Sequence, residues 1–512
     1  MTGLVIGIDA STTATKAVAW TAAGEAVAEG RAPVGLSSPL PNYYEQDPEE
    51  WWGSARAALR QVTSAVAADR IAAVSVANQR ETIGYFRRDG RSVRPGTVWL
   101  DERARHSFRG FCDRLGADAE GRPLFHRITG KPVDFIPAVF RIAWMAEHEP
   151  GLHRETEVFS DVHGYLARRL TGRWATSRAS ADPLGLFDLA ARRWSEPVMA
   201  LAGIDASRLP EAEAPGTVLG EVTAAAAAET GLKAGTPVVA GGGDGQLAGL
   251  GCNALTPDTA YLNIGTALVS GIHGAAYLTS PAWRTMGSPT GEGYYYESCL
   301  RGGTFTVTWF LETICAGEPA PREALLRRLE AAAAGLPAGA QGLLMLPYWQ
   351  GVMSPHWNPV ARGAFVGLSG AHGQGHLYRA MLEGLALEQR LATEAAEARL
   401  GRKVERYVAI GGGAASALWR QIFADATGKR VERSDTVEAS SLGAAICAAV
   451  GAGWFPAFAD AARAMAGRIV EVAVPSPEGH AAYGEVLALF GQLYGRLEPL
   501  YEGLDRLAGR TA

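Results

Sequence analysis

The chain has 512 residues, of which 47% are hydrophobic and 20% charged, and its formal net charge is -5. A chain of this length is too long to fold around a single hydrophobic core, so we expect two domains of a soluble globular protein. The basic residues are scattered rather than clustered, which argues against nucleic acid as a partner. The five cysteines are far apart and form no CxxC pair, which argues against a disulfide framework or a zinc site.

The first apolar run, residues 4–8, has no basic residue before it and ends at Asp9, so we do not expect a signal peptide. Residues 439–458 are uncharged and long enough for a membrane span. Their serines, small residues and Pro456 favour a buried helix and a turn instead. We therefore expect a cytoplasmic protein with reduced cysteines and no membrane partner.

Strands and helices alternate along the chain in an open α/β pattern. The first forty residues predict a meander with a turn at 22–25, a helix begins at Pro48, and residues 71–99 predict strands around a hairpin turn at 88–91. A similar series begins at Thr259, and residues 405–428 predict a strand, a glycine turn and a helix. Two α/β halves follow, with weak internal symmetry and a boundary near Gly251, so we expect domains at 1–251 and 252–512.

Two polar turns, one in each half, have the composition of phosphate-binding loops. Asp9 is followed by small hydroxyl residues as far as Lys16, so backbone N–H groups and hydroxyls suit phosphate oxygens and the carboxylate suits Mg²⁺. In the second half, Gly265 permits close backbone approach and Thr266 offers a hydroxyl. A plain polar β-turn also explains the first segment, and this alternative stays open.

A third turn, residues 411–416, contains three glycines and opens a helix for which Ser416 is the predicted N-cap. The glycines leave room for a flat ligand or a phosphate at the helix N-terminus. A tight strand-to-helix turn is the alternative, although it needs only one or two glycines.

Asp244 is a single carboxylate framed by glycines after an apolar run. Residues 243–248 match GxGxxA, but the next strand ends without the acidic residue that would bind a ribose, so we do not favour a Rossmann oxidoreductase. Glycines on both sides let a substrate hydroxyl come within hydrogen-bond distance of a general base. An N-cap for a helix that begins near Gln246 is the structural alternative, and both roles are compatible.

Arg80 and Glu81 stand side by side at the polar end of a strand, where the crevice of an open α/β sheet lies. Arg80 suits donation to a polyol or carbonyl oxygen, and Glu81 suits acceptance from hydroxyls, as a sugar requires. Trp99 could cover the apolar face of such a ligand. A surface ion pair and a core tryptophan are the alternatives.

Segments over nearly the whole chain resemble the FGGY family of carbohydrate kinases, among them IGIDASTTATKAV, NQRETIGYF, GGGDGQLAGLG and GGGAASALWRQIFAD. The resemblance implies an α/β fold of two actin-like, ribonuclease-H-like domains with ATP in the cleft between them. It also implies that the first domain holds most of the sugar site and the second most of the adenosine site.

The same resemblance implies roles for residues at matching positions. Asp244 would be the catalytic base and, together with Asp9, a ligand of Mg²⁺. The residues implied in substrate binding are Arg80, Glu81, Trp99, Asp244 and Gln246. Those implied in ATP binding are Thr12, Thr13, Lys16, Gly265, Thr266, Gly412, Gly413 and Ala414.

The implied reaction is in-line transfer of the γ-phosphoryl group of MgATP to a primary hydroxyl of a small sugar or polyol. Arg80, Glu81 and Trp99 follow a glycerol-kinase-like pattern, whereas residues 411–425 are spaced as in xylulose kinases, so a ketopentose, glycerol and erythritol all stay open. Ile136 stands near the substrate tyrosine of glycerol kinases, and Ser11 replaces the usual glycine of the first turn. A catalytically silent ATP- and sugar-binding sensor is the alternative function, and a homodimer is left open.

Overall fold

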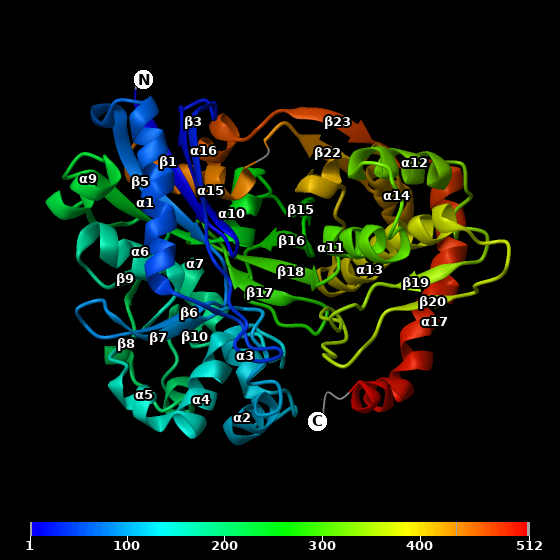
Figure 1. Ribbon diagram of the computed structural model, residues 1–512, viewed down its shortest axis with the longest axis horizontal. Coiled ribbons are helices and arrows are strands. Elements are labelled where there is room, and N and C mark those ends of the chain that lie inside the picture. Colours follow the sequence, from blue (N-terminus) through cyan, green and yellow to red (C-terminus); the bar gives the residue numbers. More distant parts are fainter. Residues whose placement is uncertain (1–2, 437, 509–512) are drawn as a thin grey trace.

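The computed structural model describes residues 3–436 and 438–508 and has two lobes, each built on a mixed sheet (Figure 1). The described strands of the first sheet are, in order, β13 (Val218–Glu221), β14 (Pro237–Gly243), β5 (Ile71–Asn78), β1 (Leu4–Ala10), β2 (Ala14–Trp20) and β3 (Ala26–Pro33). Those of the second sheet are β17 (Arg284–Gly287), β18 (Tyr294–Leu300), β16 (Leu268–Gly274), β15 (Thr259–Ile264), β21 (Arg406–Ile410), β22 (Arg430–Ser434) and β23 (Ile469–Ala473).

The two sheets share one topology, as the internal symmetry of the sequence predicts. β1 pairs antiparallel with β2 and parallel with β5, while β15 pairs antiparallel with β16 and parallel with β21. β14 then lies parallel beside β5, and β22 lies parallel beside β21. Parallel strands end at the same edge of a sheet, so the turns after β1, β5 and β14 come together in the first lobe.

Helices pack on both sheets, and smaller sheets extend the lobes. The helices of residues 1–251 are α1 (Pro48–Ala65), α2 (Phe108–Leu115), α3 (Leu124–Thr129), α4 (Ala138–His148), α5 (Pro150–Glu155), α6 (Val162–Thr171), α7 (Arg178–Ala181), α8 (Glu196–Leu201), α9 (Ala224–Thr230) and α10 (Asp244–Gly251). Those that follow are α11 (Thr304–Trp309), α12 (Arg322–Ala334), α13 (Gln374–Leu400), α14 (Ala417–Thr427), α15 (Ala439–Gly451), α16 (Phe458–Met465) and α17 (Pro477–Leu507).

The first lobe is enlarged by a sheet of β4 (Glu45–Gln46), β7 (Ser92–Thr97), β6 (Ile83–Phe86) and β8 (Val158–Ser160). Three short pairs complete the described strands: β10 (Phe187–Asp188) with β11 (Arg193–Trp194), β12 (Glu211–Glu213) with β9 (Ala175–Ser177), and β19 (Leu344–Leu346) with β20 (Ala364–Val366).

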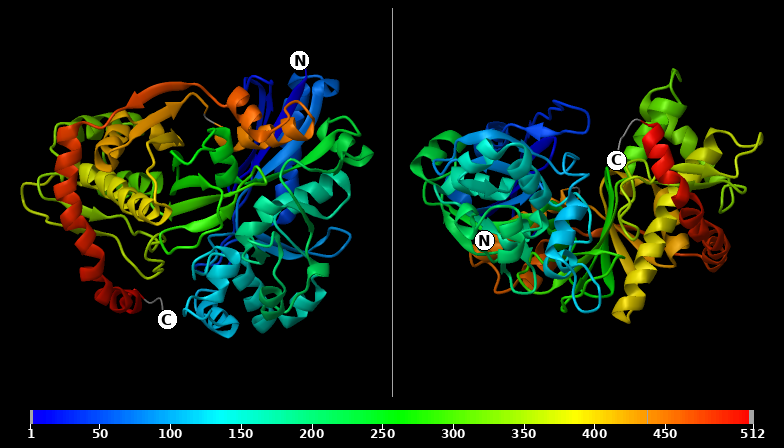
Figure 2. Two further views of the ribbon diagram at one scale, coloured as in Figure 1. Left: turned by 180° about the vertical axis from the view of Figure 1, so that it is seen from behind. Right: turned by 90° about the horizontal axis from the view of Figure 1, so that it is seen from below.

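α15 belongs to the second half of the sequence but packs on the first sheet, where the orange helices α15 and α16 lie beside the blue strands in Figures 1 and 2. Leu442 and Ile446 share a buried cluster with Val5 and Val239. The chain then returns to the second sheet with β23, which pairs with β22. Residues 252–512 therefore include a helix that completes the core of the first lobe, which the sequence boundary at Gly251 does not indicate.

Local predictions about helix ends and buried segments are confirmed. α1 begins at Pro48, and the side chain of Ser416 caps α14 by accepting a hydrogen bond from the N–H of Trp419. The uncharged stretch after residue 438 forms α15, and no helix in the described ranges is long and apolar enough to cross a membrane. All five cysteines are buried and free.

Candidate active site

A cavity of about 310 Å³ lies where turns from both lobes meet. The first lobe contributes the carboxyl ends of β1, β5 and β14, and the second lobe contributes the turn between β15 and β16. The sequence-predicted site residues that line it are Asp9, Thr12, Arg80, Glu81, Trp99, Asp244, Gly265 and Thr266. The fold thus brings residues of the two predicted phosphate-binding turns, Asp244, Arg80 and Glu81 to one cavity.

Asp244 is the first residue of α10, and Gly243 occupies the N-cap position, so the N-cap alternative for this aspartate is wrong. Its Oδ1 accepts a hydrogen bond from the N–H of Gly245 at 2.7 Å and lies 3.1 Å from Nε of Arg80. Burial raises the pKa of the Asp244 carboxyl, and Arg80 opposes this rise. A carboxylate with a raised pKa is a better proton acceptor near neutral pH.

Arg80 and Glu81 are buried and bind partners in the second lobe, so the surface-pair alternative is wrong. Arg80 donates to Glu297 at 2.7 Å, and Arg284 donates to Glu81 at 2.7 Å and to Glu297 at 2.6 Å. Although burial opposes it, Arg284 and Arg80 lower the pKa of Glu297 to about 2. A chain of alternating charges therefore runs from Asp244 through Arg80, Glu297 and Arg284 to Glu81.

Glu81 and Trp99 are each held in place by a specific contact. Glu81 has a φ of 57°, which is uncommon for a residue with a side chain, and its carbonyl accepts a hydrogen bond from Arg141. Trp99 is half-buried, and its Nε1 donates to Oγ1 of Thr12 at 2.9 Å. Trp99 therefore is no core tryptophan: it lines the cavity and contacts the turn that follows β1.

Asp9 carries the least satisfied carboxylate of the cavity. Its Oδ1 is buried and has no hydrogen-bond partner among the described residues. Burial, Asp244 and Glu438 raise the pKa of Asp9 to about 8, against the effect of Lys16. Lys16 is itself ion-paired with Glu438, and neither Lys16 nor the exposed Thr13 lines the cavity.

The remaining predicted residues surround the cavity without lining it. Gly412, Gly413 and Ala414 form a short turn after β21, next to Gly411, where an added Cβ would lie 2.6 Å from Oδ1 of the cavity residue Asn263. The glycine turn therefore packs against the end of β15, just before the turn between β15 and β16. Gln246 is fully buried, and its Nε2 donates to the carbonyl of Ala179 at 2.9 Å. This hydrogen bond links α10 to α7.

Sequence reasoning missed the second-lobe partners of the Arg-Glu pair. Arg284 lies on β17 and Glu297 on the neighbouring β18, and the hydroxyl of Tyr261 donates to Glu297 at 2.6 Å. Arg301, directly after β18, also lines the cavity. The available signal was a charged residue inside an apolar strand, as in YYYESCL.

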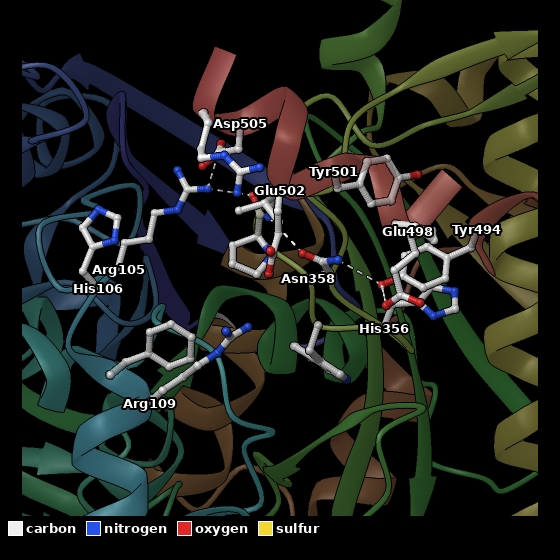
Figure 3. A pocket seen from close by; sticks show the side chains of 16 residues that line it. Arg105, His106, Arg109, His356, Asn358, Tyr494, Glu498, Tyr501, Glu502 and Asp505 are labelled. Carbon is white, nitrogen blue, oxygen red and sulfur yellow. Dashed lines mark hydrogen bonds and ion pairs between the residues drawn. The ribbon is translucent and has the colours of Figure 1, made fainter. Parts of the chain in front are cut away.

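A second cavity, of about 690 Å³, lies between residues 105–109 of the first lobe and the C-terminal helix α17 (Figure 3). Arg105 donates to Asp505 of α17 at 3.4 Å and to the carbonyl of Pro359 at 3.3 Å, and Asp505 is also paired with Arg362. The lining of this cavity includes none of the sequence-predicted site residues. These contacts join the lobes in addition to the ion pairs of Arg80 with Glu297 and of Glu81 with Arg284.

Two lobes of one topology, with carboxylates, hydroxyls and glycines gathered at the turns between them, define a two-domain, actin-like phosphotransferase. Residues 4–251 match the model of the FGGY family of carbohydrate kinases, N-terminal domain, and residues 260–452 match the C-terminal domain of the same family. The chain belongs to the FGGY family of carbohydrate kinases.

Similar proteins agree with this assignment over nearly the full length. The chain is 28% identical to a xylulose kinase of Bacillus subtilis, with 98% of each protein covered, and 30% identical to a glycerol kinase of Bordetella parapertussis, with 88% of this chain and 89% of that protein covered. The solved xylulose kinase of Rhodospirillum rubrum superimposes with a TM-score of 0.88 at 30% identity, covering 98% of this chain and 100% of that one. The predicted fold is confirmed, and the chain is a kinase that uses ATP and an alcohol acceptor.

Proposed function

We propose that this kinase transfers the γ-phosphoryl group of ATP to a primary hydroxyl of a small sugar or polyol, with Asp244 as the general base. The position of Asp244 carries the proposal: its carboxylate lies in the cavity that both phosphate turns line, beside a buried arginine. The similarity to xylulose and glycerol kinases supports a ketopentose or a short polyol as the acceptor. The five buried free cysteines support a cytoplasmic location.

In this mechanism Asp244 accepts the proton of the attacking hydroxyl. Arg80 orients the carboxylate and keeps its own charge, because a guanidinium does not lose its proton in proteins. The Thr12 and Thr266 hydroxyls and the N–H of Gly265 donate to phosphate oxygens where negative charge develops. Positioning supplies roughly 7 to 11 kcal/mol and a general base roughly 3 to 5 kcal/mol, so orientation by the two lobes contributes most.

The cavity also fits Mg²⁺. The unpartnered Oδ1 of Asp9 and the carboxylate of Asp244 would hold the ion, and no cluster of three or more His, Cys, Asp or Glu side chains in the described ranges forms a separate metal site. One or two carboxylates together with substrate phosphates are the usual protein environment of Mg²⁺. When bound, the ion neutralises charge on the phosphate oxygens.

The test is ADP release by the purified protein with MgATP and glycerol, erythritol, D- and L-xylulose or D- and L-ribulose. We expect one compound to raise turnover above the sugar-free rate, and Asp244→Asn to lower that turnover by about 10²- to 10⁴-fold with an unchanged circular dichroism spectrum. Asp69→Asn, which changes an exposed aspartate outside the cavity, is the matched control.

Two outcomes would contradict the proposal. An Asp244→Asn variant as active as the Asp69→Asn control would exclude the base role. Binding of ATP and sugar with no turnover of any compound would instead support the sensor alternative.

A further inference from the structure

The β17–β18 pair presents a row of charged side chains to the catalytic cavity. Arg284 on β17 is the register partner of Glu297 on β18. Alternate residues of a strand share a face, so Cys299 and Arg301 continue the row that Glu297 begins. Arg284, Cys299 and Arg301 all line the cavity. The second lobe therefore adds two guanidinium groups to the one that Arg80 supplies.

Arg301 differs from the other two arginines in its partners. Arg80 and Arg284 each have two carboxylates within about 3 Å, at the distances given above. Arg301 donates to the carbonyl of Gln350 at 3.0 Å, and its nearest carboxylates, those of Glu102 and Asp134, are both 3.9 Å away. That distance is beyond a hydrogen bond.

The guanidinium of Arg301 therefore has N–H donors that no protein acceptor uses among the described residues. A guanidinium has five N–H donors, and one of them has a protein acceptor at hydrogen-bond distance among the described residues. The side chain is only 10% exposed and lines the cavity, so a ligand bound there could accept from its remaining donors. Its Cζ lies 4.7 Å from the centroid of the Phe135 ring, which holds the guanidinium against the wall.

We infer that the acceptor is a polyhydroxylated carboxylic acid, whose carboxylate binds Arg301 while a hydroxyl at its other end lies at Asp244. This inference rests on the proposed function and names the substrate class of the same site. The planar fork of an arginine matches a carboxylate with two parallel hydrogen bonds.

The surroundings of Arg301 favour one negative charge on the ligand. The carboxylates of Glu102 and Asp134 both lie 3.9 Å from the guanidinium, so a ligand carboxylate at hydrogen-bond distance would be the nearest anion to Arg301. A carboxylate brings a single charge, whereas a phosphate ester would bring two into a cavity that must also hold the phosphates of ATP. Glu81 remains available to accept from hydroxyls of the ligand, and Ile136 and Met353 provide apolar wall.

The experiment compares each acid with the alditol of the same carbon number, which carries CH₂OH in place of the carboxylate. The pairs are glycerate and glycerol, erythronate and erythritol, arabinonate and arabinitol, and gluconate and sorbitol. We expect one acid to exceed its alditol in kcat/KM by about 10- to 100-fold, the range of a hydrogen bond to a charged group. Arg301→Gln should lower the kcat/KM of the acid by about the same factor, and that of the alditol far less.

Two further variants separate charge from geometry and from folding. Arg301→Lys keeps the charge but loses the planar group that forms two parallel hydrogen bonds. It should therefore retain part of the preference for the acid that Arg301→Gln loses. Arg327→Gln removes an arginine that is 72% exposed on α12 and should leave the preference intact. Circular dichroism and thermal unfolding of each variant confirm that it is folded.

The outcomes distinguish this inference from the proposed function. Turnover of a neutral sugar or alditol above every acid, with Arg301→Gln acting equally on both classes, overturns the inference and leaves phosphoryl transfer standing. If no compound is turned over, calorimetric titration with the acids decides. Acid binding that Arg301→Gln weakens supports the anion site although the proposed transfer fails, and the absence of acid binding overturns the inference.

Discussion

The turn between β1 and β2 and the turn between β15 and β16 are built alike and differ in charge. Each has three residues, 11–13 in the first lobe and 265–267 in the second, between antiparallel strands beside a parallel third strand. The last-but-one residue of the leading strand is Asp9 in the first turn and Asn263 in the second. One turn thus holds a carboxylate where the other holds a neutral amide.

This difference shows how a repeated fold supports unlike tasks. Both turns have backbone N–H groups and a threonine hydroxyl, which suit phosphate oxygens, but only the first has a carboxylate beside it, which suits a cation. The neighbouring strands diverge in the same way, since β5 leads into Arg80 and Glu81 whereas β21 leads into the glycines of residues 411–413. Topology is shared, and the chemistry is set by the residues at strand ends.

The largest effect should come from making the two turns alike. Asp9→Asn gives both an amide, and we expect kcat to fall by about 10²- to 10³-fold, as for the loss of one group that stabilises the transition state. The free Mg²⁺ needed for half-maximal ADP release should rise. Asn263→Ala is the control and should leave the Mg²⁺ dependence unchanged; an unchanged dependence in Asp9→Asn would remove Asp9 from the metal site.

Each lobe also buries an acid whose pKa is raised by burial, so the stability of both lobes should fall as the pH rises. Glu388 of the second lobe accepts from Tyr348 with one oxygen, and burial raises its pKa to about 7. Asp161 of the first lobe accepts from Gly164 and Thr176, and burial raises its pKa to about 6. The folded protein therefore binds the Glu388 proton more tightly than the unfolded chain does.

Stability from Glu388 is thus fully present below its ordinary pKa of 4.5 and is lost as the pH rises to about 7. The difference between these values corresponds to about 3 kcal/mol. Between pH 4 and pH 8, the free energy of unfolding of Glu388→Gln, measured in urea, should rise by that amount relative to the native protein. Glu394→Gln changes an exposed glutamate of the same helix and should show no such rise. Parallel curves for Glu388→Gln and the native protein would contradict the assignment.

A smaller effect should distinguish the packing of α15 in the first lobe from the outer surface of α17. At Gly443 in α15 an added Cβ would lie 2.0 Å from the carbonyl oxygen of Leu247 in α10, so Gly443→Ala should lower the free energy of unfolding by about 2 kcal/mol. Gly484 in α17 has open space around it, and Gly484→Ala should raise that free energy by about 0.5 to 1 kcal/mol. Thermal unfolding of both variants checks the contrast, and equal shifts would refute it.

Local patterns predicted much of the fold and the position of Asp244, because strand, turn and cap signals act over a few residues. The charge partners could not be found in this way. Arg80 meets Glu297 across 217 residues of sequence, and Glu81 meets Arg284 across 203. Such pairs depend on how the lobes pack, and neighbouring sequence left open only a surface ion pair of Arg80 and Glu81, which the fold does not make.

The return of α15 to the first lobe has a consequence for the growing chain. The first sheet is synthesised almost entirely within the first half of the sequence, yet its apolar cover is translated only with residues 439–451. Val5, Val239 and Leu247 therefore stay accessible to other molecules while roughly two hundred further residues emerge from the ribosome. The first lobe is synthesised early but cannot complete its core until residues 439–451 have left the ribosomal exit tunnel. We therefore expect chaperones to bind the nascent chain until that point.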